Sequence, residues 1–170
     1  MTGRQTALWI VNAVLLVGVA ALTVFGGYEL LMKSRPAPAA LADRADLRQA
    51  VTDAAATSTA KILTYSPGTI EQDMAAGLAV TTGEFAEYYK DFTERIVMPA
   101  ARQKNVTTTA TVAQSGVISI DNPDTAAALV FVNQVTTSTE NPDPNHQSSS
   151  VRVGMRKVDG QWRISSFDPQ

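Results

Sequence analysis

The most apolar part of the chain is a stretch from Thr6 to Tyr28 that carries no charged residue. As a helix that rises about 1.5 Å per residue, it would be roughly 34 Å long, enough to cross a hydrocarbon core of about 30 Å. A secretory signal peptide has a shorter apolar core of about 7–15 residues, followed by small residues at the cleavage site. We therefore expect residues 1–32 to form a retained transmembrane anchor.

Small residues occur along this anchor at Gly18, Ala21 and Gly26, where they would let another membrane helix approach closely. Spans that pair with nothing also contain such residues, so this packing role stays open. The positive charges on the two flanks nearly balance, and they do not decide which side of the membrane the rest of the chain occupies. Residues 33–40 (KSRPAPAA) predict a short, stiff linker, because two prolines favour extended backbone.

Beyond the linker, apolar positions recur every three or four residues, which predicts an amphipathic helix over residues 41–65. Ser66-Pro67-Gly68 breaks this helix, and a short helix over residues 69–78 follows. A third helix, capped by Thr82, carries a stripe of aromatic side chains. Pro99 either kinks or ends that helix.

From Val106 the period becomes two and β-branched residues become frequent, which predicts strands. In the first strand we expect a bulge or a sharp bend at Ser115-Gly116. The second strand, residues 125–139, is apolar on both faces at its centre, which predicts a central strand covered on both sides. After a polar loop, Asp159-Gly160 joins the last two strands in a tight hairpin.

Helices followed by strands predict an α+β domain over residues 41–170, with helices packed on a curved four-stranded antiparallel sheet. The hairpin turn also predicts the register of the last two strands, with Met155 facing Ile164 and Arg156 facing Arg163. The second pair sets two cations directly opposite each other. This costs stability unless an acidic group or a partner answers them.

Composition argues against several kinds of chemistry. The chain has no cysteine, which excludes disulfides, thiolate zinc sites and cysteine nucleophiles. A formal net charge of −2 argues against nucleic-acid binding. The single histidine, His146, lies in a predicted loop without the oriented partner that a catalytic base needs, and no nucleotide-binding, zinc-protease or serine-hydrolase motif occurs. We therefore expect a non-enzyme without cofactor or metal that acts by holding other proteins.

Two groups of residues are candidates for binding. Arg152, Arg156 and Arg163, with Trp162 beside the hairpin turn, could meet an acidic partner or lipid head groups. The simpler alternative is a solvated outer face, and Trp162 could equally pack on the first helix. The aromatic stripe could line a cavity for an apolar ligand, although a plain helix–sheet core needs the same spacing. The candidates for this pocket or core are Tyr65, Phe85, Tyr88, Tyr89 and Phe92.

Several segments of the chain together resemble one known family. After the N-terminal span they are ILTYSP, TIEQDMAAGLAVTTGEFAEYYKDFTERIVMPAARQKNV, TATVAQSGVIS, ALVFVNQVTTS and VRVGMRKVDGQWRISSFDP. In this order they are similar to the Mce-associated membrane proteins of actinobacteria. Among the most specific pieces are Thr82-Gly83-Glu84-Phe85 and the hairpin Val158–Trp162.

The resemblance implies a cystatin-like or nuclear-transport-factor-like roll on the extracytoplasmic side of the cell membrane. It also implies a non-catalytic accessory subunit that stabilises an Mce-type lipid import complex, with the permease and Mce proteins as partners. Two alternatives stay open. One is a subunit of another envelope or secretion assembly, and the other is a small roll domain that binds an apolar ligand.

Overall fold

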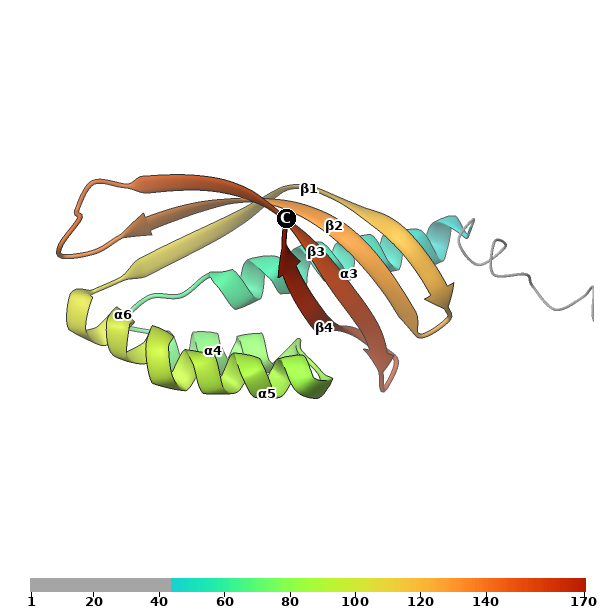
Figure 1. Ribbon diagram of the computed structural model, residues 1–170, viewed down its shortest axis with the longest axis horizontal. Coiled ribbons are helices and arrows are strands. Elements are labelled where there is room, and N and C mark those ends of the chain that lie inside the picture. The colour runs from blue at the N-terminus through green and yellow to red at the C-terminus, as the bar shows by residue number, and fades with distance from the viewer. Residues whose placement is uncertain (1–43) are drawn as a thin grey trace, which may run out of the picture. The chain divides into compact units, whose positions relative to one another are not determined.

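The computed structural model describes residues 44–170. The predicted anchor and linker, with the helix-packing candidates Gly18, Ala21 and Gly26, lie outside this range. Within residues 44–170, no helix is both long and apolar enough to cross a membrane. The described chain runs through helices first and strands afterwards, and the strands arch over the helices (Figure 1). The predicted α+β class is confirmed.

Helices make up the first half of the described chain. They are α3 (Ala45–Leu63), α4 (Ile70–Ala79), α5 (Gly83–Phe92), the π-helical turn η1 (Thr93–Val97) and α6 (Met98–Lys104). Helix α3 presents Val51, Ala55 and Ile62 to the core, at the spacing that the sequence predicts. Thr82 occupies the N-cap position of α5, although its side chain makes no capping hydrogen bond.

Pro99 distorts the third predicted helix without ending it. Proline lacks a backbone N–H, and its ring would collide with the carbonyl of Arg95 in a regular α-helix. The turn before it is π-helical instead, with the Met98 N–H bonded to the Thr93 carbonyl. The helix then resumes as α6 and stops at Asn105, whose backbone is left-handed with φ of 51°.

Four antiparallel strands follow in the order β1-β2-β3-β4. They are β1 (Thr107–Asn122), β2 (Thr125–Thr137), β3 (Asn145–Val158) and β4 (Gln161–Pro169). Asp159 and Gly160 both have positive φ, as a tight two-residue hairpin requires. The predicted register is confirmed, because Met155 pairs with Ile164 and Arg156 with Arg163.

One stretch of β1 and one of β3 differ from the prediction. Ser115-Gly116 pairs regularly with β2, and extra residues of β1 lie on either side of it, at Ala113 and Ile118. Each bulge keeps the flanking apolar residues on the core face. The predicted loop position of His146 is wrong: His146 lies in β3 opposite Val135, because β2 is long enough to offer backbone partners to that part of the chain.

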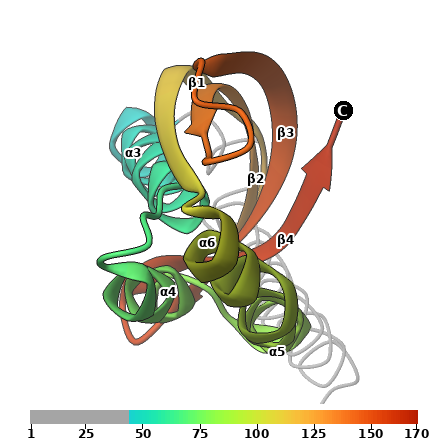
Figure 2. The ribbon, with the colours of Figure 1, turned by 90° about the vertical axis from the view of Figure 1, so that its left-hand side faces the viewer.

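Strand β2 lies between β1 and β3, as predicted, but it is not covered on both sides. On the concave face Ala128, Val130 and Val132 are buried. On the outward face Phe131 is 44% exposed. Helices lie on one side of the sheet only in the described chain, and an antiparallel sheet can leave its other face to water. Figure 2 shows α5 and α6 below the curved sheet and α3 beside β1.

Short backbone bridges join the helical segments to both edges of the sheet. Tyr65 exchanges two backbone hydrogen bonds of 2.9 Å with Thr108 of β1. At the other edge, Ile164 of β4 accepts from Thr82 at 2.8 Å and donates to Val80 at 2.9 Å. These bridges occupy edge groups that would otherwise stay unpaired. They also hold the helices at a fixed distance from the concave face, where the candidate site lies.

Candidate functional site

Helix α5 divides its aromatic side chains between the core and the surface. Tyr89 is buried, and Phe85 is half-buried with its ring stacked on Phe167 of β4 at a centroid separation of 6.1 Å. Tyr88 and Phe92 are 62% and 43% exposed, and their rings stack on each other at 5.9 Å. The stripe therefore contributes both to the core and to an open surface.

That surface is one wall of a groove of about 540 Å³. The groove lies between α5, η1 and α6 on one side and the concave face of the sheet on the other. All five aromatic candidates from the sequence line it: Tyr65, Phe85, Tyr88, Tyr89 and Phe92. Its volume falls within the range of about 300–1,000 Å³ that small-molecule sites occupy.

Polar groups reach the groove mainly through its floor on β1 and β2. The hydroxyls of Thr108 and Thr136 bond to each other at 3.1 Å. The side-chain amide of Gln134 also lines the floor, and within residues 44–170 it has no hydrogen-bond partner. None of the described residues that line the groove carries a charge. The groove is thus apolar, with a few uncharged hydrogen-bonding groups.

The hydroxyl of Tyr89 is enclosed by the core. It lies 3.5 Å from the carbonyl oxygen of Ile62 and 3.8 Å from the sulfur of Met74. Burial, with a smaller contribution from the Asp73 carboxylate, raises the pKa of Tyr89 to about 12. The phenol stays protonated at neutral pH and cannot serve as a general base there.

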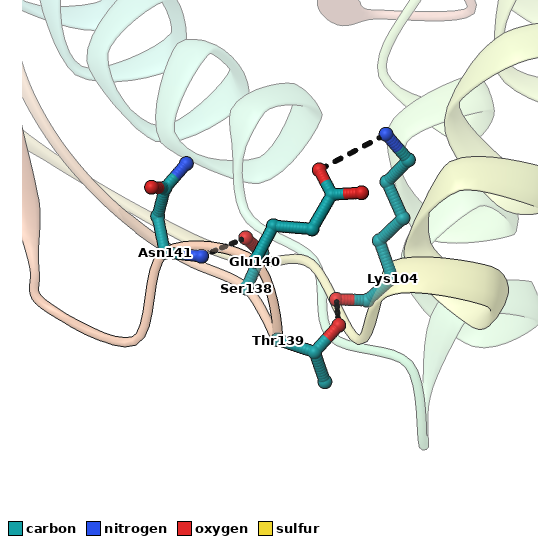
Figure 3. Close-up of polar contacts among 5 residues, drawn as sticks. All are labelled: Lys104, Ser138, Thr139, Glu140 and Asn141. Carbon is teal, nitrogen blue, oxygen red and sulfur yellow. Dashed lines mark hydrogen bonds and ion pairs between the residues drawn. The ribbon is translucent and has the colours of Figure 1, made fainter.

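The structure brings the two sides of the groove together through a contact between α6 and the loop after β2 (Figure 3). The Lys104 carbonyl accepts hydrogen bonds from the backbone N–H and the hydroxyl of Thr139, at 2.8 and 2.9 Å. The Lys104 ammonium forms an ion pair with Glu140 at 3.1 Å. Ser138 and Asn141 close the loop with two further hydrogen bonds. Sequence reasoning missed this contact, since its residues are distant along the chain and form no motif.

A second candidate surface is the outward face of the β3–β4 hairpin. Arg152, Arg156 and Arg163 lie on it, and we call these three residues the cationic strand face. Arg156 and Arg163 are direct cross-strand partners, and neither makes an ion pair within the described residues. Arg163 is half-buried, and its Nε has no hydrogen-bond partner in residues 44–170. Arg152 lies opposite Asp168, so an acid faces that cation.

Trp162 lies on the other face of the same hairpin. It is half-buried and packs against the core, and the Lys157 ammonium sits 5.8 Å from its ring centroid. Trp162 thus packs inward, and its contact with a partner stays a prediction. His146 is exposed, and among residues 44–170 no three histidine, aspartate or glutamate side chains are grouped to hold a metal ion.

Comparison with known proteins identifies relatives in Mycobacterium tuberculosis. No family model matches the chain. The uncharacterized protein Rv1362c is 46% identical over 121 residues, which are 71% of this chain and 54% of that protein. The chain thus spans about half the length of this relative. The outer membrane protein Rv1973 is 36% identical over 130 residues, which are 76% of this chain and 80% of that protein.

Solved structures share the fold at much lower sequence identity. The periplasmic domain of DotI has a TM-score of 0.59 and 14% identity, with 72% of this chain and 94% of that chain covered. CagV, a VirB8 homolog of T4SS from Helicobacter pylori, has a TM-score of 0.56 and 11% identity, with 72% and 97% covered. These matches show a common roll of helices on an antiparallel sheet. The sequence match over most of both proteins shows more: this chain belongs to the family of the mycobacterial protein Rv1973.

Proposed function

We propose that the protein is a non-catalytic subunit of a multiprotein assembly in the cell envelope. Residues 1–32 would hold it in the cytoplasmic membrane, with the described domain on the extracytoplasmic side. Its relative Rv1973 is named an outer membrane protein. The fold neighbours are a periplasmic domain and a VirB8 homolog of T4SS. These names support an envelope location and a role in assembly.

Within this role, we propose that the assembly is an Mce-type lipid importer, with the permease and Mce proteins as partners. The support is the resemblance to the Mce-associated membrane proteins. It is carried by Thr82-Gly83-Glu84-Phe85 and the hairpin Val158–Trp162, which follow an apolar N-terminal segment in that order. A subunit of another envelope or secretion assembly would use the same anchor and the same fold. The identity of the partners separates the two.

The observation that carries the assembly role is the pairing of Arg156 with Arg163. Like charges directly opposite each other on two strands oppose folding. No acid among the described residues forms an ion pair with either guanidinium. Carboxylates of a partner would neutralise both, and they could accept paired hydrogen bonds from each planar guanidinium. We propose the cationic strand face as the docking surface for an acidic protein partner.

Isolation of the tagged full chain from its own membranes in mild detergent tests the assembly role. We expect permease and Mce proteins among the co-purifying proteins identified by mass spectrometry. Secretion subunits in their place would favour the alternative assembly. A chain that purifies without any membrane partner would contradict the assembly role itself.

Charge reversal tests the docking surface. Arg163→Glu should lower partner recovery by about tenfold, which corresponds to roughly 1.4 kcal/mol of binding free energy. Arg95→Glu is the matched control, because Arg95 is an exposed arginine that lies on η1 and not on the cationic strand face. Its guanidinium pairs with the Asp91 carboxylate at 2.6 Å. It should leave recovery unchanged. Equal recovery with both variants would remove the cationic strand face from the proposal.

A further inference from the structure

The groove is walled by apolar side chains that the protein leaves in contact with water. Tyr88, Phe92 and Ile96 are 62%, 43% and 56% exposed, and they follow one another at intervals of four residues. All three line the groove. Apolar side chains that are exposed singly are ordinary, whereas a contiguous exposed row marks a surface that binds something.

The π-helical turn keeps this row over the groove. In a regular α-helix, each step of four residues turns about 40° further around the axis, so a long row of this spacing would move off the groove. The wider turn at Thr93–Val97 offsets part of that rotation. The groove-lining residues at this spacing are Tyr88, Phe92, Ile96 and Ala100. Departures of this kind from regular helix geometry are frequent at functional sites.

Three polar groups of the groove have no hydrogen-bond partner among residues 44–170. They are the side-chain amide of Gln134 and the hydroxyls of Tyr65 and Tyr88. Gln134 is half-buried in the floor, and its amide can both donate and accept a hydrogen bond. A hydroxyl or carbonyl group of a ligand that rests on the floor would satisfy it, while the apolar body of the ligand covers the aromatic wall.

Charge limits the chemistry of this ligand. A carboxylate or ammonium group in the groove would lose hydration without meeting an opposite charge among the described lining residues, which costs free energy. A neutral hydroxyl or carbonyl needs only hydrogen bonds. We infer that the groove binds an uncharged amphiphile, with its apolar body along Phe92 and its polar group at Gln134. This inference goes beyond the assembly role and does not depend on it, because the cationic strand face lies on the outward side of the sheet.

Photo-cross-linking of the full chain in its own membrane tests the inference. Membranes are incubated with a diazirine-bearing analogue of 1-dodecanol and irradiated, and labelled peptides are identified by mass spectrometry. We expect labels within residues 83–104 and 133–137. The matching analogue of dodecanoate, which is charged at neutral pH, should label these two segments several-fold less. Labelling by dodecanoate that equals or exceeds labelling by dodecanol would overturn the uncharged character of the ligand.

Two phenylalanines of nearly equal exposure provide a matched pair of variants. Phe92 on the groove is 43% exposed, and Phe131 on the outward face of β2 is 44% exposed. Phe92→Glu should reduce dodecanol labelling of residues 83–104 and 133–137 several-fold, whereas Phe131→Glu should leave it unchanged. Equal labelling in the two variants would overturn the assignment of the groove as the site.

Gln134→Leu tests the polar end without introducing a charge. It should reduce labelling by the dodecanol analogue about three- to tenfold, as expected for one hydrogen bond, and leave labelling by a dodecane analogue unchanged. An equal loss with both probes would overturn the role of the Gln134 amide. Arg163→Glu should leave labelling by every probe intact, so that a failure of the assembly role and a failure of the groove are seen separately.

Discussion

Gly77 of α4 lies directly against the hydroxyl of Tyr89 on α5, so close that a Cβ on residue 77 would overlap the Tyr89 oxygen. Glycine is required here because the two helices approach closely. The backbone of Gly77 does not have a positive φ, so its conformation does not need glycine. The contact holds the Tyr89 ring beneath the groove, which the same ring lines.

Gly77→Ala should therefore destabilise the domain by about 1–3 kcal/mol, the usual cost of overpacking. Gly116→Ala is the matched control, because no atom lies within 4 Å of the Cβ that it would add. Pulse proteolysis of the full chain in urea would measure both free energies of unfolding. A similar loss in the two variants would show that the Gly77–Tyr89 contact has no special role.

Tyr89 should make stability depend on pH in the alkaline range. Its pKa rises from an ordinary value of 10.0 to about 12, first because of burial and then because of Asp73. Below pH 10 both folded and unfolded chains keep the proton. Between pH 10 and 12 the unfolded chain loses it first, so the free energy of unfolding falls as the pH rises. The urea midpoint of Tyr89→Phe should fall less steeply over this range, and parallel profiles would contradict the assignment.

The Arg156–Arg163 pair should make the isolated chain more stable when one charge is removed. Arg163→Thr replaces a cation with a β-branched residue and should add about 0.2–1 kcal/mol to the free energy of unfolding at low salt. The gain should shrink as salt increases, because salt screens the repulsion that the substitution removes. Arg152→Thr is the control. Arg152 faces Asp168, so removing its charge should not raise the free energy of unfolding. A gain from Arg152→Thr as large as that from Arg163→Thr would contradict the explanation.

The contact between α6 and the β2–β3 loop should depend more on Thr139 than on Glu140. Thr139→Val removes a 2.9 Å hydrogen bond to the Lys104 carbonyl and should cost about 0.5–1.5 kcal/mol. Glu140→Gln removes an ion pair whose two side chains are 51% and 63% exposed, and such pairs contribute little. Hydrogen exchange at the amide of residue 139, which bonds to the same carbonyl, should therefore accelerate more in Thr139→Val. The reverse order would assign the contact to the ion pair.

Local sequence was enough to predict the order of helices and strands and the pairing of the last two strands. The three-to-four spacing of Ala55, Ser58 and Ile62 is a property of the helix itself, and so a pattern of this kind could be recognised before any packing was known. Asp159-Gly160 is a turn of fixed length, and its geometry alone places Arg156 opposite Arg163. Bulges are different, because the extra residues Ala113 and Ile118 are set by the register against β2.

The pattern of residues alone predicts helices followed by an antiparallel meander, with a pair of arginines facing each other at the last hairpin. Which aromatic residues are covered depends on how these elements pack together. Tyr88 and Tyr89 are chemically identical neighbours, yet one is 62% exposed and the other 7%. Periodicity shows which side chains share a face, but burial depends on what lies opposite that face. Here Ile62 and Met74 lie against the Tyr89 hydroxyl, whereas the space beside Tyr88 remains open as the groove.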